Sequence, residues 1–372
     1  MGSFLNFILP YKEGEHPNWC IQGPITYKVY EDFSYTFFPE FKPNCKNYIL
    51  IEPSEALKGF VHNIQYLIEN NIKQFMYDND VKMVLASIAD PPNHDNYLLL
   101  LDELKRFELL DRTIILSSNM ALKYDNLHCF NYFVEDFIKY KHLFYGKTDL
   151  GYTSEEIQLK EIDNFRNKKF LSFNRTVDKE HRYSLYHDYL THDFSDSYFS
   201  FLYFEGTHCE PYQKPKLSKE EYYSKIPVEL DTKGFFNFST HNTFKKELFL
   251  DSCIHIVTET SFKYNELFVS EKVLKPVLNY QPFIVLGPVN YLKELKRLGL
   301  KTFSEFWDES YDEIEDAEQR YFKVSELILN LNSKSIEELN ELYQKTKETV
   351  IFNKNYLNSL KLNELDTFLK NL

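Results

Sequence analysis

Short apolar runs alternate with longer amphipathic stretches over the first part of the chain. The segments 47–53, 81–90 and 112–118 are apolar and end near turn residues, which is typical of buried β-strands. The intervening segments 55–70 and 95–109 have apolar residues at helical spacing. A repeated strand–helix–strand order predicts a parallel sheet that is covered by helices.

The second half of the chain repeats this rhythm. We expect strands and helices, in chain order, at 168–175, 178–190, 248–260, 270–280, 281–288 and 290–300. Asp178 is a candidate N-cap for one of these helices, and Gly299 is a stop signal for the last. Weak periodicity over 191–246 predicts irregular connections, whereas 317–371 has the pattern of helices.

The chain length of 372 residues is typical of two domains. The polar, turn-rich segment 141–168 is a candidate linker between them. We therefore predict an N-terminal domain over 1–155, a second domain over 165–345 and a C-terminal helix over 346–372.

Charge and cysteine content exclude several classes of function. The net charge is −13 and no long basic run occurs, so nucleic acid is a poor candidate for the partner. The five cysteines lie far apart and form no CxxC pair, which disfavours a cysteine-based zinc site and fits a reducing compartment. No run of 18 apolar residues and no signal-peptide pattern occur, so we expect a cytoplasmic protein without a transmembrane segment.

Several common catalytic motifs are missing from the sequence. No GxGxxG follows the first predicted strand, and no GxxxxGK[ST] or GxSxG occurs. These absences disfavour dinucleotide oxidoreductases, P-loop nucleotide hydrolases and α/β-hydrolases. In parallel α/β sheets ligands bind at the carboxyl ends of the strands, so the loops after each predicted strand are the place to search for a site.

The first of these loops lies in the segment FLSFNRTVDKEHR. Asn174 and Arg175 follow the predicted strand, and His181 and Arg182 lie about one turn into the next helix. An arginine beside a helix N-terminus suits an anionic ligand, because the free N–H groups and the helix dipole both favour negative charge. The alternative is a surface salt bridge for Arg175 and a solvated position for Arg182.

The second loop lies in LFVSEKVLKPV. Ser270 can cap a helix that begins at Glu271, and an acid in the first turn complements the helix dipole. Lys272 opposes that dipole, and a bound diphosphate would remove the conflict. Lys275 lies three residues further on, on roughly the same helix face.

The third loop lies in IVTETSFKYNE. Glu259 stands at a strand end and can either contact a sugar hydroxyl or act as a structural hydrogen-bond acceptor. The acidic stretch 306–316 is expected to form a solvated loop and a helix start. No DxD pair follows a predicted strand, so we predict that the protein needs neither a metal nor a cofactor.

These segments, in this order, resemble a group of bacterial and large-virus glycosyltransferases with the GT-B architecture. The Ser-Glu-Lys segment with its following helix and strand is similar to the donor-binding motif of the α-1,3-fucosyltransferases. FLSFNR resembles the element that opens the C-terminal domain of those enzymes. The resemblance covers about residues 168–320. The Leu-Lys-Pro after Ser-Glu-Lys-Val and the Gln281-Pro282 pair depart from the fucosyltransferase pattern, which leaves the donor sugar and base open.

The resemblance implies an α/β fold with two Rossmann-like domains that face each other across a cleft, followed by C-terminal helices. It implies that a nucleotide sugar, with a GDP-fucose-like compound as the example, donates a sugar to a glycan or polysaccharide hydroxyl. Donor-binding residues would come from the second domain: Asn174, Arg175, Arg182, Glu259, Ser270, Glu271, Lys272 and Lys275. By analogy, the C-terminal helix would cross back to the first domain.

The same resemblance assigns the catalytic base to the first domain, where a carboxylate or histidine would deprotonate the acceptor hydroxyl. Post-strand candidates are Glu52 and Glu55 on one loop and Asp90 and His94 on another, with Asp90 and Glu52 as the catalytic residues that we predict. Two other functions stay open. One is a catalytically silent relative that binds a nucleotide or glycan, and the other is a different doubly wound enzyme, such as a sugar-nucleotide epimerase.

Overall fold

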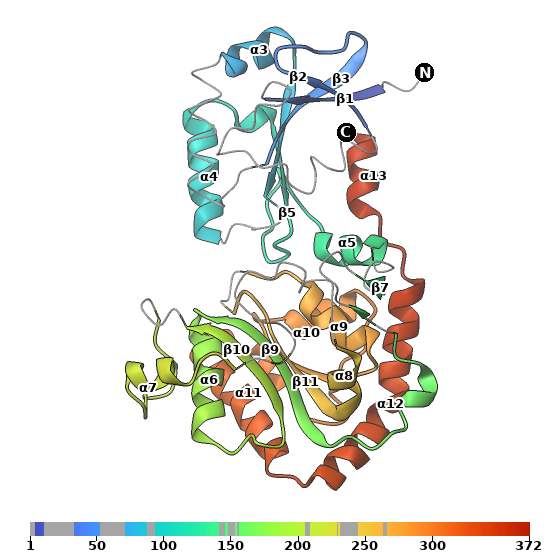
Figure 1. Cartoon of the computed structure of the whole chain (residues 1–372). Helices are drawn as coiled ribbons and strands as arrows, with labels where there is room; N and C mark the ends of the chain where they lie inside the picture. Colours follow the sequence, from blue (N-terminus) through green and yellow to red (C-terminus); the bar gives the residue numbers. More distant parts are fainter. Residues whose placement is uncertain are drawn as a thin grey trace. The chain divides into compact units, whose positions relative to one another are not determined.

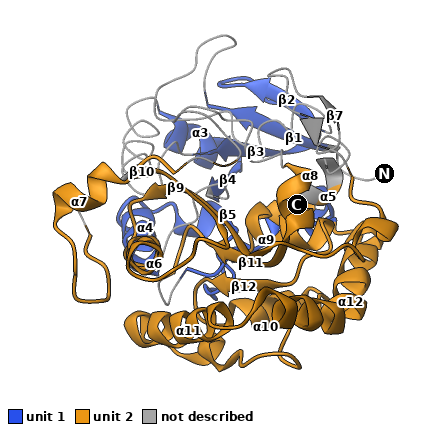
Figure 2. Ribbon diagram, turned by 60° about the horizontal axis from the view of Figure 1, so that its bottom comes forward, with its two compact units in different colours: residues 1–132, 265–268, 363–372 blue, residues 133–264, 269–362 orange. Residues whose placement is uncertain are grey.

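The computed structural model describes residues 4–10, 33–52, 71–87, 94–140, 146–147, 153–154, 156–204, 209–228, 230, 245–262 and 266–372. Internal contacts divide the chain into two compact units, which Figure 2 shows in different colours. Unit 1 comprises residues 1–132, 265–268 and 363–372, and unit 2 comprises residues 133–264 and 269–362. Each unit is built on a parallel sheet, so the predicted α/β class is confirmed.

The sheet of unit 1 has six parallel strands in the order β2-β1-β3-β4-β5-β6. Their bounds are β1 Phe4–Leu9, β2 Ser34–Phe37, β3 Cys45–Ile51, β4 Lys82–Ser87, β5 Thr113–Ser117 and β6 Leu127–Cys129. The predicted strands at 47–53, 81–90 and 112–118 correspond to β3, β4 and β5. The strands β1, β2 and β6 were not predicted from the periodicity, and β2 and β6 are only four and three residues long.

Alternating strand residues supply two separate cores to unit 1. Helices α3 (Ile72–Asp78) and α4 (His94–Arg106) pack on one face, where Tyr97 and Leu104 are fully buried. Helix α13 (Glu364–Asn371) packs on the other face through Leu365 and Leu369. Figure 1 shows α4 and α13 on either side of the strands. The predicted helix at 55–70 lies outside the described residues.

The sheet of unit 2 has four parallel strands in the order β10-β9-β11-β12. Their bounds are β9 Lys168–Val177, β10 Tyr198–Phe204, β11 Ser252–Thr258 and β12 Phe283–Leu286, and a short antiparallel pair joins β7 Gly146–Lys147 to β8 Thr153–Ser154. Every residue of β11 and β12 is buried. A parallel sheet that is covered on both faces explains why β12 is a continuous apolar run and why β11 has no alternation of buried and exposed residues.

Most of the other helices among the described residues belong to unit 2, as the orange part of Figure 2 shows. They are α5 Tyr132–Tyr140, α6 Glu180–Thr191, α7 Lys219–Ser224, α8 Lys246–Asp251, α9 Glu271–Leu278, α10 Tyr291–Arg297, α11 Ala317–Asn332 and α12 Ile336–Ser359. Short 3₁₀ turns in the described part of the chain are Leu110–Arg112 in unit 1, and Leu159–Glu161 and Ser310–Glu313 in unit 2. The predicted C-terminal helices are confirmed, and Gly299, with φ +91°, follows α10 as expected.

Two local predictions were wrong. Residues 191–246 contain strand β10 and helix α7. The aromatic segment YFSFLYF pairs with β9 as the edge strand of the sheet, and a capping box at Ser218 starts α7. Asp178 is not the cap of α6. The N-cap position is held by Lys179, and the Asp178 carboxylate accepts a hydrogen bond from Thr176 instead.

The acidic stretch 306–316 is only partly solvated. The Asp312 carboxylate is buried and accepts hydrogen bonds from the backbone N–H groups of Leu292 and Lys293 in the first turn of α10. Glu309 accepts from the Thr302 hydroxyl and the Phe303 N–H. These two acids therefore hold a helix N-terminus and a loop in place, which periodicity does not reveal.

Candidate active site

The carboxyl ends of β9 and β11 lie side by side in unit 2. Ile254 pairs with Phe170 and His255 with Leu171, and the Thr258 hydroxyl donates to Asn174 Oδ1 at 2.7 Å in the same register. That register places Arg175 beside Glu259, one residue beyond the end of β11, and on the same face of the sheet. The sheet thus brings together two candidates that are far apart in sequence.

Glu259 is the centre of this edge. Its carboxylate is almost fully buried and accepts hydrogen bonds from Ser270 at 2.7 Å and from Tyr291 at 2.5 Å. Lys272 Nζ lies 3.8 Å from the same carboxylate. Burial, and then the neighbouring Glu259, raise the pKa of Tyr291 well above its ordinary value, so this phenol stays a hydrogen-bond donor. These hydrogen bonds and the nearby ammonium group offset the free-energy cost of burying the Glu259 carboxylate.

Helix α9 begins at this edge, as predicted. The Ser270 hydroxyl caps it by accepting a hydrogen bond from the Lys272 N–H. Lys272 Nζ lies 3.1 Å from the Thr260 hydroxyl and 3.7 Å from a Glu271 carboxylate oxygen, and its side chain is 30% exposed. Glu259 and Glu271 both lie within ion-pair distance of Lys272, so these carboxylates offset part of the conflict between its charge and the helix dipole.

Arg182 reaches the same edge from α6. Its guanidinium donates to the Glu259 carbonyl at 3.1 Å and to the Thr176 hydroxyl at 3.2 Å, and it lies 3.4 Å from Asp178. His181 contacts the same carbonyl at 3.0 Å. Burial lowers the pKa of Arg182, although the charges of Asp178 and Glu259 oppose that shift. Arg182 is buried and donates a hydrogen bond to a backbone carbonyl, so the solvated position considered for it is wrong.

Asn174 and Lys275 are less directly placed for a ligand. Both ends of the Asn174 amide have protein partners, because Oδ1 accepts from Thr258 and Nδ2 donates to Ser172 at 3.1 Å. Lys275 lies one turn further along α9, where its charge contributes to lowering the pKa of the buried His255. The structure thus gathers Glu259, Ser270, Glu271, Lys272, Arg175 and Arg182 at the strand ends, with Asn174 inside the sheet and Lys275 farther along α9.

The chain is similar to solved α1,3-fucosyltransferases. One such structure shares 10% identity, with 97% of this chain and 91% of the other covered and a TM-score of 0.40. Structures of α1,3-fucosyltransferase with GDP and with GDP-fucose have TM-scores of 0.38 and 0.37 at the same identity, and 92% of each is covered. No protein-family model matches the chain, and no curated protein matches it.

Two residues of this edge were missed in the sequence. Tyr291 lies in the first turn of α10, after the loop that follows β12, so a search of every post-strand loop would have found it. Arg320 on α11 is buried, and its guanidinium donates to the Gly287 carbonyl at 3.2 Å and to the Phe262 carbonyl. It therefore ties together the loops after β11 and β12. No sequence signal marks it, because it comes from a distant helix.

The catalytic candidates of unit 1 are only partly described. Glu52 follows β3 at the carboxyl end of that strand and is buried. Asp90 and Glu55 lie outside the described residues. His94 is the first residue of α4, and its Nδ1 lies 2.8 Å from the Tyr124 hydroxyl. The assignment of Asp90 and Glu52 as catalytic residues stays a prediction.

Among the described residues, no three or more His, Cys, Asp or Glu side chains form a group that could hold a metal ion. Among the described helices, none has both the length and the apolar character needed to cross a membrane.

Proposed function

We propose that the protein is a glycosyltransferase whose unit 2 binds the diphosphate of a nucleotide-sugar donor at the carboxyl ends of β9 and β11. The proposal rests on one arrangement: Lys272 in the capped first turn of α9, with Arg175 at the adjoining strand end. Two cations and a helix N-terminus at the carboxyl edge of a parallel sheet are suited to a phosphate ligand. The resemblance of the Ser270-Glu271-Lys272 segment to a known donor motif supports the same function.

The ion pairs of Lys272 suggest how a diphosphate would bind. Its Nζ lies 3.7–3.8 Å from two carboxylates rather than in a close bidentate contact, and the side chain is partly exposed. Coulomb attraction to a phosphate with up to two negative charges would exceed the attraction to either carboxylate at equal distance. We infer that Lys272 turns to the phosphate while Glu259 keeps its bonds to Ser270 and Tyr291.

Glu271 and Glu259 would then have different roles. Glu271, in the first turn of α9 and partly exposed, is placed to accept hydrogen bonds from ribose or sugar hydroxyls. Glu259 is buried and bonded on both oxygens, so it is a positioning residue for the start of α9 rather than a ligand contact. Arg182 and Asn174 would likewise act by holding the strand ends.

The chemistry follows from these positions. Cleavage of a glycosyl–phosphate bond leaves negative charge on the departing diphosphate, and preorganised cations stabilise that charge. The cations Lys272 and Arg175 supply this without a metal, so we propose a metal-independent enzyme without a cofactor. The acceptor would be a glycan or polysaccharide hydroxyl, and the base that deprotonates it would be Asp90 or Glu52 of unit 1. A cytoplasmic location and a role in polysaccharide synthesis complete the proposal.

Thermal-shift titration of the full chain with nucleoside diphosphates and nucleotide sugars tests the donor site. GDP and GDP-fucose come first because of the sequence resemblance. A ligand of the native state adds about 2.7 kcal/mol of apparent stability at a hundredfold excess over Kd. Lys272→Ala should remove the shift. Lys296→Ala is the matched control, because Lys296 on α10 also lies 3.7 Å from a glutamate but away from the strand ends.

The outcomes separate the proposed function from its alternatives. A shift with one nucleotide that disappears in Lys272→Ala and persists in Lys296→Ala supports the site. Release of the nucleoside diphosphate that requires an acceptor glycan then distinguishes a transferase from a silent relative or an epimerase. If no nucleotide shifts the melting temperature, the donor site assigned to Lys272 is wrong.

A further inference from the structure

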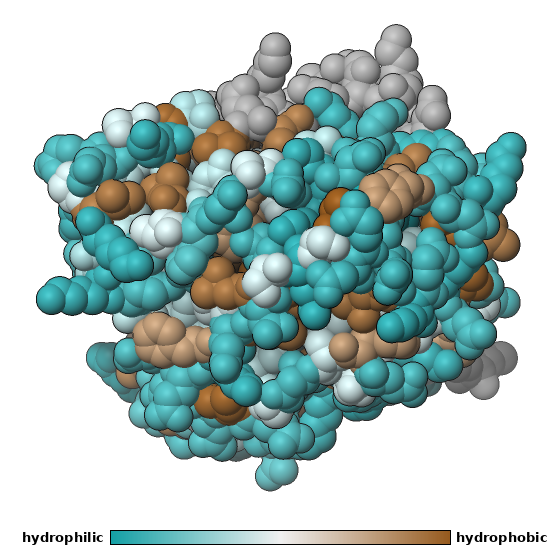
Figure 3. Space-filling view, turned by 90° about the horizontal axis from the view of Figure 1, so that it is seen from below, coloured by the Kyte–Doolittle hydropathy of each residue, from teal (hydrophilic) through white to brown (hydrophobic). Residues whose placement is uncertain are grey.

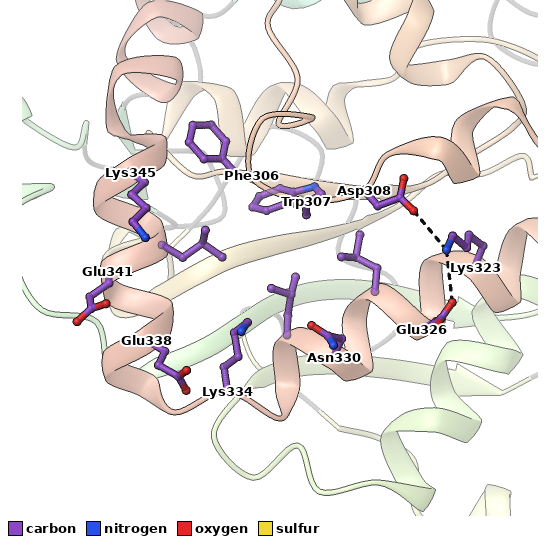
Figure 4. Close-up of a pocket in the computed structure, with 13 residues that line it drawn as sticks. Phe306, Trp307, Asp308, Lys323, Glu326, Asn330, Lys334, Glu338, Glu341 and Lys345 are labelled. Carbon is purple, nitrogen blue, oxygen red and sulfur yellow. Dashed lines mark ion pairs between the residues drawn. The ribbon is translucent and has the colours of Figure 1, made fainter.

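A pocket of about 500 Å³ lies in unit 2 between α11, α12 and the loop at 306–308. This volume is within the range of small-molecule binding sites. Figure 4 shows Phe306 and Trp307 on the loop on one side of the pocket, with side chains of α11 and α12 on the others. Three leucines, Leu327, Leu331 and Leu342, complete the apolar part of the lining.

The pocket is separate from the candidate donor site. Lys169, the second residue of β9, donates through Nζ to the carbonyl of Asn332 at the end of α11. The turn between α11 and α12 therefore lies at the amino ends of the strands, whereas Lys272 and Arg175 lie at the carboxyl ends. Lys334 in this turn lines the pocket. A ligand here would not occupy the donor site.

The aromatic wall is held rigidly. The Trp307 ring is mostly buried and stacks on Phe303 with centroids 5.2 Å apart, and Phe303 packs edge-on against Phe283 of β12. Glu309 fixes the backbone of this loop by accepting the Phe303 N–H at 2.7 Å. The neighbouring Phe306 is half-buried. A preformed apolar surface of this kind loses little freedom when a ligand binds.

The rest of the pocket lining can both donate and accept hydrogen bonds. Eight of the thirteen lining residues are charged or carry an amide, with three lysines and four acids among them. Lys323 is paired with Asp308 at 3.3 Å and Glu326 at 3.6 Å, as the dashed lines in Figure 4 show. The side chains of Lys334, Lys345 and Glu341 have no ion-pair partner among the described residues. Donors and acceptors thus remain available for a ligand.

We propose that this pocket binds a neutral oligosaccharide. An anion would meet the four acids, and a cation would meet the three lysines, whereas sugar hydroxyls can both donate to carboxylates and accept from ammonium groups. The apolar faces of sugar rings can pack on the half-buried ring of Phe306 beside Trp307. The face in Figure 3, seen from below the α11–α12 turn, is mostly hydrophilic with small separate apolar groups, which suits a sugar better than an extended apolar helix. The inference does not depend on the donor site.

Tryptophan fluorescence gives a direct test. The chain has two tryptophans, Trp19 and Trp307, so Trp19→Phe leaves the pocket residue as the single reporter. This variant of the full chain is titrated with lactose, maltose, maltotriose and N,N′-diacetylchitobiose, without any nucleotide. We expect a saturable change in Trp307 emission with at least one of these sugars.

Paired variants locate the binding. In the same background, the double variant Glu341→Ala/Lys345→Ala removes two lining side chains that are exposed and make no ion pair among the described residues. The control Gln344→Ala/Glu348→Ala changes two exposed residues of the same helix outside the pocket. The first should weaken sugar binding about tenfold or more, since each lost charged hydrogen bond is equivalent to such a factor. The control should bind as the parent does.

Three results would overturn the proposal. One is the absence of a saturable response to all four sugars while circular dichroism shows a folded chain. Another is equal sugar affinity in both double variants, which would place the binding elsewhere. The third is a saturable response to an amphipathic Leu/Lys helical peptide but to no sugar, which would make the pocket a peptide-docking groove.

Discussion

The Tyr291 hydroxyl donates a 2.5 Å hydrogen bond to Oε1 of Glu259, and Ser270 donates to the other carboxylate oxygen at 2.7 Å. These bonds connect the first turn of α10, the end of β11 and the cap of α9. The Tyr291 ring lies close to Gly287, where an added Cβ would be 3.1 Å from the ring. Three post-strand segments are therefore fixed around one buried carboxylate, and Lys272 is positioned by that arrangement.

Tyr291→Phe should weaken both folding and nucleotide binding. The variant removes one donor to a buried carboxylate, which costs about 1–3 kcal/mol of unfolding free energy in urea denaturation. It should also raise the Kd for the nucleoside diphosphate that shifts the parent protein, because Ser270 and Lys272 lose a fixed neighbour. Tyr343→Phe is the matched control, since its buried hydroxyl donates to the Tyr280 carbonyl just before β12, away from the carboxyl ends of the strands. Equal nucleotide affinity in both variants would show that Glu259 does not position Lys272.

Substitutions of Arg175 and Arg182 should differ in their effects on stability and on nucleotide binding. Arg175 is half-buried at the strand end, whereas Arg182 is buried and donates to backbone. Arg182→Gln removes the ion pair with Asp178 and weakens the hydrogen bond to the buried Glu259 carbonyl. The free energy of unfolding should therefore fall by about 3 kcal/mol or more. Arg175→Gln should change stability less and weaken nucleoside diphosphate binding more. Calorimetric titration and urea denaturation of both variants measure the contrast, and the reverse order would contradict the site.

The sequence predicted local structure where the residues concerned are neighbours in the chain. Ser270, Glu271 and Lys272 are adjacent, so their place in the first turn of α9 followed from the capping pattern. Contacts between distant segments were not predictable in this way. The bonds from Tyr291 to Glu259 and from Arg320 to two loops depend on the sheet register and on helix packing, which no local pattern encodes. For the same reason, β10 was missed, because its aromatic run does not alternate and reads as irregular.

Asp312 should make stability depend on pH in a defined direction. Burial raises the pKa of its carboxyl from 3.8 to about 6 in the folded chain. The folded state therefore binds this proton more tightly than the unfolded state. The stabilisation from protonation is complete below about pH 4 and is lost as the pH rises through about 6.

Asp312→Asn isolates this contribution, because asparagine does not titrate and keeps one carbonyl oxygen as an acceptor for the α10 N-terminus. The difference in unfolding free energy, parent minus variant, should fall between pH 4 and pH 7 by up to about 3 kcal/mol. Urea denaturation of both proteins across this range measures it. A difference that is constant or that grows with pH would show that Asp312 is not protonated in the folded chain near pH 5.

Helix α13 should be required for the stability of unit 1. Leu365 and Leu369 are buried against Phe7 and Leu50, and the Tyr48 hydroxyl donates to the Leu372 carbonyl oxygen at 2.6 Å. Leu369→Ala removes a fully buried side chain, so it should cost about 2–5 kcal/mol. Thr367→Ala changes an exposed residue of the same helix and should be nearly neutral.

Hydrogen exchange followed by mass spectrometry can assign that loss to one unit. In Leu369→Ala, protection should fall in peptides from β1 and β3, which lie in the sheet that α13 covers. Peptides from β9 and β11 belong to unit 2 and should exchange as in the parent. Equal loss of protection in both sets would show that the two units unfold together, and unchanged exchange in β1 and β3 would show that the C-terminal helix does not support the first sheet.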